Sequence, residues 1–277
     1  MEKIICFCKW RQDLAPVELA KKLKSLGFDG ADLPCRPGAP VTHANGPRKL
    51  PEYHKALKDE GLTLERLVTN ISEVNAETEK LLDAIRKLGV KKIRINWGSL
   101  GDADPRAKID EARRKLYALQ KLLEKYGISG GIQNHSGNGL EVNISCVLHL
   151  LRDCDPKWVG IQYDPGHATI SGEPIKLAIG LMGPYLHSVN LKSPRQEYFI
   201  EPATGRLTYK PIWVPLRDGM LNVSGLLNAL KKAGYRDALS IHAEYRSYFH
   251  YVENDKEATD KLVAEDVRHV RQALKNI

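Results

Sequence analysis

Polar and ionisable residues follow short apolar runs at four places in the sequence. The four segments are Ile132-Gln133-Asn134-His135, Gln162-Tyr163-Asp164-Pro165-Gly166-His167, Ser188-Val189-Asn190-Leu191-Lys192 and Ile241-His242-Ala243-Glu244-Tyr245-Arg246. Side chains alternate between the two faces of a strand, so polar residues two apart share a face and the apolar residues between them take the other. Carboxylates and imidazoles can move protons, and an ammonium group can stabilise an oxyanion.

A single Asp or His at a strand end often caps a loop or satisfies a buried polar group. Five ionisable groups at the same end of several strands meet no packing need, and they are Asp164, His167, Lys192, His242 and Glu244. We therefore predict one polar active centre.

Lys192 needs a counter-ion if it points inward, because burial disfavours the charged form of a lysine. Asp164, on the preceding predicted strand, is the expected partner. The pair would hold the ammonium in its charged form.

The elements that position these residues show a repeated pattern in which a helical segment ends with a basic residue and a glycine, and an apolar run follows. Glycine there supplies the left-handed cap, and cations suit the helix dipole. Examples are Lys24-Ser25-Leu26-Gly27, Lys58-Asp59-Glu60-Gly61, Arg86-Lys87-Leu88-Gly89, Glu124-Lys125-Tyr126-Gly127 and Lys231-Lys232-Ala233-Gly234. Each glycine is thus predicted to join a helix to a strand.

Eight apolar runs alternate with helical patterns along the chain. The runs are Ile4–Cys8, Gly30–Pro34, Thr63–Thr69, Lys92–Trp97, Ile128–Asn134, Val159–Asp164, His187–Lys192 and Ala238–Tyr245. The helices are expected near 16–26, 50–60, 75–88, 105–126, 140–152, 173–181, 222–233 and 258–275. This alternation predicts an α/β protein, a (β/α)8 TIM barrel forming a single domain over residues 1–277. A doubly wound sheet is the alternative, but no Gly-rich phosphate loop follows an early strand.

Two predicted connections, 35–49 and 193–219, are longer than a joint requires, and both leave the carboxyl ends of strands, which form the catalytic face of such a barrel. The second contains Tyr198, Phe199, Arg206 and Trp213, with a hairpin turn predicted at 203–206. We expect this lid-like segment to fold over the barrel mouth. Trp97 and Trp213 fit the core and sugar stacking equally well.

Composition excludes disorder and a membrane span, since 42% of the 277 residues are hydrophobic and 27% charged. The net charge of +8 is spread over short clusters at predicted helix ends, which favours solvated surfaces over a nucleic-acid footprint. Five cysteines without a CxxC pair are typical of reduced thiols. A charged start that runs into a strand predicts a cytoplasmic protein, although a removed leader would be invisible.

Several motifs together resemble one known family, the xylose-isomerase-like TIM barrels, a sugar phosphate isomerase/epimerase group that also includes endonuclease IV. The motifs are Gly27-Phe28-Asp29-Gly30, Asn134-His135-Ser136-Gly137, Asp164-Pro165-Gly166-His167-Ala168, Asn190-Leu191-Lys192, Gly219 before a helix, and Gly234-Tyr235 before a strand. The resemblance covers essentially the whole chain. It implies a small-molecule carbohydrate as the partner and leaves a homo-oligomer open.

The same resemblance implies a divalent metal held by Glu, Asp, His and Glu at four strand ends. This chain offers Gln133, Asp164, Asn190 and His242 at those positions, with Glu244 two residues on, so only Asp164 matches. Fewer carboxylates weaken the field that Mg²⁺ and Mn²⁺ require. A different set, drawn from His135, His167, His242, Asp164 and Glu244, would suit Zn²⁺ or Mn²⁺. Binding of a divalent metal (Mn, Mg or Zn) and its absence are therefore both left open, and the site expected for a bound metal is built from Asp164, Gln133, Asn190 and Glu244.

The activity that the resemblance implies is proton abstraction next to a sugar carbonyl, which forms an enediolate and makes an isomerase or epimerase. In this reaction Lys192 is expected to stabilise the enediolate oxygen, and Glu244 or His167 to act as the base, with His242 as the alternative. Expected substrate contacts come from Asn134, His135, Arg36, Trp97 and Arg246. Alternatives are a keto-sugar lyase or hydrolase acting by β-elimination and an inactive sugar-binding barrel. A nuclease is disfavoured, because that chemistry needs metals held by several His and carboxylates, and two of the positions carry amides.

Overall fold

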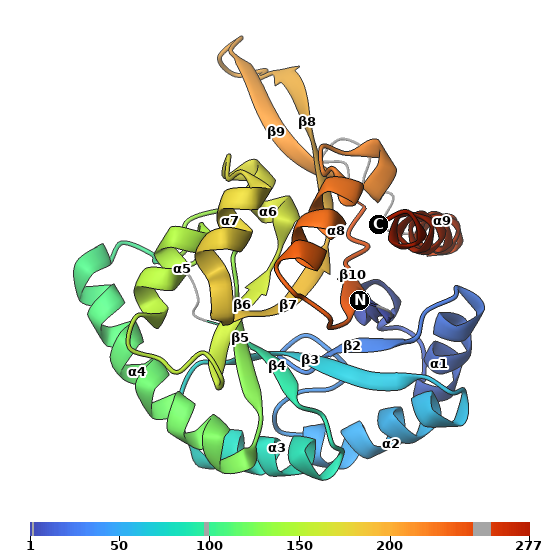
Figure 1. The fold of residues 1–277 in the computed structure, drawn as a ribbon, viewed down its shortest axis with the longest axis vertical. Coiled ribbons are helices and arrows are strands. Elements are labelled where there is room, and N and C mark those ends of the chain that lie inside the picture. The colour runs from blue at the N-terminus through green and yellow to red at the C-terminus, as the bar shows by residue number, and fades with distance from the viewer. Residues whose placement is uncertain (2, 97–99, 246–255) are drawn as a thin grey trace.

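Eight parallel strands close into a barrel in the computed structural model, which describes residues 1, 3–96, 100–245 and 256–277 (Figure 1). The strands are β1 (Ile4–Phe7), β2 (Gly30–Pro34), β3 (Thr63–Ile71), β4 (Lys92–Ile95), β5 (Ser129–Gln133), β6 (Val159–Tyr163), β7 (Leu186–Leu191) and β10 (Leu239–Ile241). Each pairs in parallel with its neighbours, and β10 lies between β7 and β1. The predicted (β/α)8 barrel is confirmed.

Helices surround this barrel. They are α1 (Pro16–Ser25), α2 (Gly46–Asp59), α3 (Ala76–Lys87), α4 (Pro105–Tyr126), α5 (Ile144–Leu151), α6 (Pro165–Ile170), α7 (Ile175–Met182), α8 (Val223–Lys232) and α9 (Lys256–Lys275). Asn75, Asp104 and Asn143 each cap a helix by accepting a hydrogen bond from a backbone N–H in its first turn. Gly27 and Gly127 adopt φ of +87° and +63° just after α1 and α4, which only glycine adopts readily. The predicted helix-to-strand joints are thus present. Among the described helices, none has the length and apolarity that crossing a bilayer demands.

The alternation of side chains follows the predicted pattern at the ends of the site strands. Ile132, Val189 and Leu191 are at most 1% exposed and belong to the hydrophobic core between the strands and the helices. Gln133 and Asn190 are also buried, but they form polar contacts with side chains of neighbouring strands. The barrel therefore has an apolar outer layer and a polar interior at its carboxyl end.

Residues 193–214 form an antiparallel hairpin, in agreement with the turn predicted within this segment. Its strands are β8 (Ser193–Ile200) and β9 (Leu207–Val214), and the predicted turn at 203–206 lies between them. The hairpin projects away from the barrel, so its tip lies far from the mouth that it was expected to cover (Figure 1). Only the end nearest the barrel contributes buried side chains, among them Ile212 and Val214.

Candidate active site

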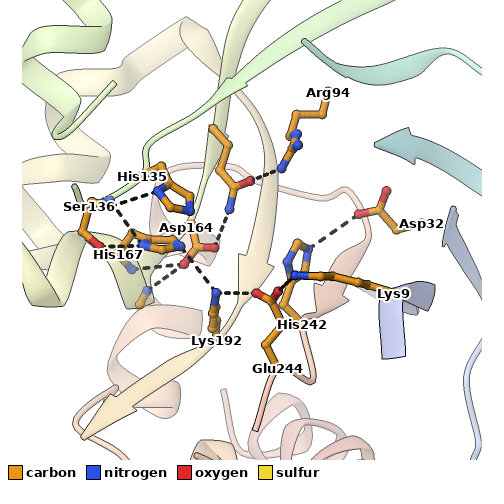
Figure 2. A network of polar contacts seen from close by, with 12 residues as sticks. Lys9, Asp32, Arg94, His135, Ser136, Asp164, His167, Lys192, His242 and Glu244 are labelled. Atoms are coloured by element: carbon orange, nitrogen blue, oxygen red, sulfur yellow. Dashed lines mark hydrogen bonds and ion pairs between the residues drawn. The ribbon is translucent and has the colours of Figure 1, made fainter. Parts of the chain in front are cut away.

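Lys192 lies at the centre of the polar cluster, in the single position between β7 and β8 (Figure 2). Its ammonium donates to Glu244 Oε2, while Lys9 donates to Glu244 Oε1. Burial alone would raise the pKa of Glu244, but the two lysines hold it well below its usual range. Glu244 is therefore a carboxylate at neutral pH. The counter-ion of Lys192 is Glu244 and not Asp164, because Glu244 reaches across from the segment after β10.

The end of the hairpin nearest the barrel covers one side of this lysine. The Trp213 ring centroid lies 3.7 Å from Lys192 Nζ, and the ring meets His167 edge-on at a centroid distance of 4.8 Å. A cation over an aromatic face is stabilised by the ring quadrupole. Of the two sequence interpretations of Trp213, its position favours a role in the site.

Asp164 organises the loop after β6. It caps α6, with Oδ1 accepting from the backbone N–H of Gly166 at 3.1 Å and of His167 at 3.2 Å, while Oδ2 accepts from Gln133 Nε2 at 2.7 Å. Burial alone would raise the pKa of Asp164, but neighbouring His167 and Lys192 outweigh burial and lower that pKa. Asn134 holds the Asp164 backbone by two hydrogen bonds of 2.7 and 2.9 Å. Both polar atoms of the Asn134 side chain are thereby engaged in positioning.

His167 is a neutral imidazole that faces Lys192. Burial lowers the pKa of His167 to about 3. Its Nδ1 accepts from the Ser136 backbone N–H at 3.2 Å, so the proton of the neutral ring belongs on Nε2, which lies 3.5 Å from Lys192 Nζ. The His135 ring lies beside it, at a centroid distance of 3.9 Å. His167 can therefore offer a hydrogen bond to a ligand but is a poor proton acceptor.

Sequence reasoning missed Arg94, which reaches the site from β4. Its Nη1 donates to Gln133 Oε1 at 2.8 Å, which extends the chain of contacts to Asp164. Burial lowers the pKa of Arg94 to about 10, so the guanidinium stays charged. The signal was available in Lys92-Ile93-Arg94-Ile95, where period-two alternation points the two cations to the face opposite the isoleucines.

On the side of the site away from His167, the side chains of Phe7, His242 and Asp32 form stacking and charged contacts. The His242 ring stacks on Phe7 at a centroid distance of 4.3 Å, and the Arg36 guanidinium carbon lies 5.8 Å from the centroid of the same Phe7 ring. His242 Nε2 lies 3.8 Å from Asp32 Oδ2, which also contacts Arg66 at 3.3 Å. Burial lowers the pKa of His242, so its ring is neutral as well.

The structure thus brings most of the predicted residues together (Figure 2). Asn190 lies lower in the barrel, where its Oδ1 accepts from Gln162 Nε2 at 2.9 Å. The predicted substrate residues Trp97 and Arg246 fall outside the described part of the chain. Lys9, Arg94 and Asp32 are the additions that sequence analysis did not identify.

The four positions at which the family resemblance implies a metal do not fit a divalent cation. Gln133 Oε1 already accepts from a guanidinium, Asn190 Oδ1 accepts from Gln162, and both oxygens of Asp164 accept from N–H donors. Across the described residues, no three His, Cys, Asp or Glu side chains are grouped as metal ligands would be. Neither of the two metal arrangements considered from the sequence is formed by these donors.

Solved structures with the same fold cover nearly all of this chain. 3-keto-D-glucoside 4-epimerase YcjR from E. coli superposes with a TM-score of 0.71 at 14% identity, covering 97% of this chain and 100% of that one. D-psicose 3-epimerase from Clostridium cellulolyticum H10, solved with D-tagatose, gives 0.70 at 15% identity over 98% and 99%. A xylose isomerase-like TIM barrel protein from Mycobacterium smegmatis in complex with magnesium gives 0.64 at 18% identity over 92% and 91%.

Sequence comparison gives one match over about half of the chain and one over most of it. An uncharacterized protein of Methanocaldococcus jannaschii, MJ1311, is 25% identical over 142 residues, which are 48% of this chain and 43% of that protein. The chain therefore spans less than half the length of that relative. Residues 20–273 match the sequence profile of the xylose isomerase-like TIM barrels, from the second half of α1 into α9. The strand-end motifs and the closed barrel agree with that match, and the chain belongs to the xylose isomerase-like TIM barrel family.

Proposed function

We propose that this protein isomerises or epimerises a carbohydrate by moving a proton on a carbon next to a carbonyl group. The observation that carries the proposal is the direct contact of Glu244 with Lys192 at the carboxyl end of the barrel. A carboxylate able to take a proton and a cation able to stabilise the resulting oxyanion are the two groups that this chemistry requires. The family, and a fold shared with proteins named as sugar epimerases, support the same reaction class.

The reaction follows from the positions of three side chains. Glu244 takes the proton from the carbon next to the carbonyl as the Lys192 ammonium turns from it to the carbonyl oxygen, because loss of that contact raises the pKa of Glu244. The C–H electron pair forms a carbon–carbon double bond, and the carbonyl oxygen becomes an enediolate oxygen. The Lys192 ammonium donates to that oxygen, and Nε2–H of His167, 3.5 Å from Lys192 Nζ, offers a second donor. Return of the proton to the former carbonyl carbon, with the hydroxyl proton passing to the enediolate oxygen, gives an isomer. Delivery of a proton from water to the original carbon on the opposite face gives an epimer, and Glu244 then passes its own proton to water.

Glu244 is better placed as the base than Asp164. The Glu244 side chain is 18% exposed, whereas Asp164 is fully buried and both its oxygens accept from N–H groups of the protein. A substrate can reach the first carboxylate but not the second. Trp213 and His135 would line the sugar on the side of His167, with Arg36 on the opposite side.

Lys192→Met tests this assignment, because methionine is similar in length but carries no charge. Turnover of a panel of keto-sugars is measured together with deuterium incorporation from D₂O at the carbon next to the carbonyl. We expect both to fall by about a hundredfold or more, the scale of one lost oxyanion donor. Lys21→Met, on the exposed surface of α1, is the matched control and should retain full activity.

Turnover of Lys192→Met within about threefold of wild type would show that Lys192 is structural and would contradict the proposal. Product analysis adds a second criterion. An isomer or epimer has the mass of its substrate, whereas a product lighter by a leaving group would identify a lyase.

A further inference from the structure

Cations of the protein contact two of the side chains that a metal site at these strand ends would use, Gln133 and Glu244. Gln133, at the end of β5, presents its carbonyl oxygen to the Arg94 guanidinium and its N–H to Asp164. Its oxygen is thus directed at a cation that belongs to the protein. A divalent ion bound to the same oxygen would meet a fixed positive charge at hydrogen-bond distance.

The Glu244 carboxylate is likewise occupied by cations of the protein. Both oxygens of Glu244 contact ammonium groups, one of Lys192 and one of Lys9, and the Lys192 side chain is only 5% exposed. Glu244 could coordinate a metal only if at least one of these lysines lost its partner inside the protein. Loss of that partner is costly for a buried ammonium.

The remaining polar atoms point to an anion as the missing ligand. Arg94 Nε is buried and has no hydrogen-bond partner among the described residues, and the Arg36 guanidinium lies over Phe7 on the opposite wall. Arg94 is connected to Asp164 through Gln133, and Lys192 contacts Glu244 and His167, so both cations belong to the network at the carboxyl end of the barrel. They supply the charge stabilisation that the reaction requires.

We propose that this protein works without a divalent metal, and that Arg94 and Lys192 supply the positive charge at the strand ends that a bound metal would otherwise supply. The part of this inference that gives Arg94 and Lys192 a role in the reaction rests on the proposed function. The absence of a metal requirement stands on the donor set alone. Lys192 acts on the substrate, and Arg94 is a positioning residue that orients Gln133 and Asp164 and adds to the local potential.

Metal content and thermal unfolding of the wild-type protein test the proposal without any substrate. Protein purified without chelator is analysed for Mg, Mn, Zn, Fe and Co. Its Tm is then recorded with EDTA and with Mg²⁺, Mn²⁺ or Zn²⁺ at about 1 mM. A ligand at about 100 times its Kd raises the Tm of a protein of this size by about 5–10 °C. We expect less than about 0.1 metal per chain, and Tm values within about 1 °C of one another.

A variant with the expected family ligands provides the positive control. Gln133→Glu, Asn190→His and His242→Glu, combined with Arg94→Met, restore the carboxylates and remove the competing guanidinium. This protein should bind about one Mn²⁺ per chain and gain several degrees in Tm. Gln133→Glu with Arg94→Met is the smaller second variant if the fourfold one does not fold. It should gain a Mn²⁺-dependent rise in Tm that the wild type lacks.

A stoichiometric metal in the wild type, or a wild-type Tm that rises with Mn²⁺ and falls with EDTA, would overturn the inference. So would an activity that EDTA abolishes and Mn²⁺ restores. A metal-free wild type that fails to exchange its substrate proton would contradict the proposed function and leave this inference standing.

Discussion

Glu244 is held between two lysines, and this arrangement makes it both the proposed base and a structural counter-ion. Lys192 and Lys9 each donate to one of its oxygens. Removing the partner of a buried charge is more damaging than removing an exposed pair, because the remaining charge stays in a medium of low dielectric. Chemistry and stability are therefore coupled at this one side chain.

Glu244→Gln should abolish proton exchange and lower the free energy of unfolding by about 3 kcal/mol, since glutamine preserves the shape but leaves Lys192 without its anion. Urea unfolding measures the second effect. Glu201→Gln, at the exposed turn of the hairpin, is the control and should stay within about 0.5 kcal/mol of wild type. Equal stability of both variants would show that the Lys192–Glu244 contact is of little energetic consequence.

Sequence reasoning found the residues of the site that follow apolar runs with clear alternation. Asp164, His167, Lys192 and Glu244 were identified in this way, and the structure places them within one network. The predicted pairing of Lys192 with Asp164 was wrong, and the observed partner is Glu244. The conformation of the chain after β10 decides which carboxylate reaches the ammonium. Lys9 was missed because it follows β1 in a short 3-10 turn, for which alternation gives no direction.

The β8–β9 hairpin is a two-stranded sheet added to the eight-stranded barrel. Its outer half carries large apolar side chains in cross-strand pairs, with Tyr198 opposite Tyr209 and Ile200 opposite Leu207. These four side chains are at least half exposed, whereas Ile212 near the barrel is 2% exposed. The outer half therefore contributes little to the stability of the barrel, and the inner half is part of the core.

The double variant Tyr198→Ser and Tyr209→Ser should change the free energy of unfolding by less than about 1 kcal/mol, because both rings are exposed. Ile212→Ala should cost about 2–5 kcal/mol, since it leaves a cavity beneath the hairpin. Thermal or urea unfolding compares the two. A large loss from the tyrosine pair would mean that the outer half packs against another surface in solution.

Local sequence predicted the turn of this hairpin but not its direction. Gly205 adopts φ of +65° in the turn, and turn residues there are a local signal. The direction depends on where β7 ends and how Trp213 packs, which are tertiary contacts. Helix α6 was missed because it has only six residues, although Asp164-Pro165 is a typical N-cap followed by proline.

At the scale of the whole molecule, α9 joins parts of the barrel that are distant in sequence. Arg271 contacts Asp29 at 3.0 Å, near the start of β2, and Asp260 contacts Arg11 at 3.0 Å. Asp266 accepts from the Leu216 backbone N–H at 3.0 Å and from the Tyr245 hydroxyl. The last helix thus connects the first strands to the segment that carries Glu244.

Asp266 should make stability depend on pH in a defined direction. Burial raises its pKa from 3.8 to about 6. Between these values the folded state binds more protons than the unfolded state, so this group destabilises the protein as pH rises through that window. The Asp266→Asn variant lacks this titrating group and so does not lose stability in that way. The difference between its free energy of unfolding and that of the wild type should therefore rise by roughly 2–3 kcal/mol from pH 4 to pH 7.

Urea unfolding of both proteins at several pH values checks this prediction. The difference between the two curves is the measured quantity, because the lowered pKa values of Asp32, Asp164 and Glu244 destabilise both proteins alike in acid. Parallel curves from pH 4 to pH 7 would contradict the raised pKa of Asp266.

The junction between β7 and β8 is one residue long, and that residue is Lys192. Backbone hydrogen bonding on both sides makes the barrel strand and the hairpin strand two rigid arms with the ammonium side chain at their hinge. Trp213, on the returning strand, contacts the same ammonium. Both strands of the hairpin therefore border the Lys192 ammonium, β8 through the backbone and β9 through the Trp213 ring. We expect an antibody fragment that binds the exposed tip and reorients the hairpin to alter the Lys192–Trp213 contact and, with it, turnover.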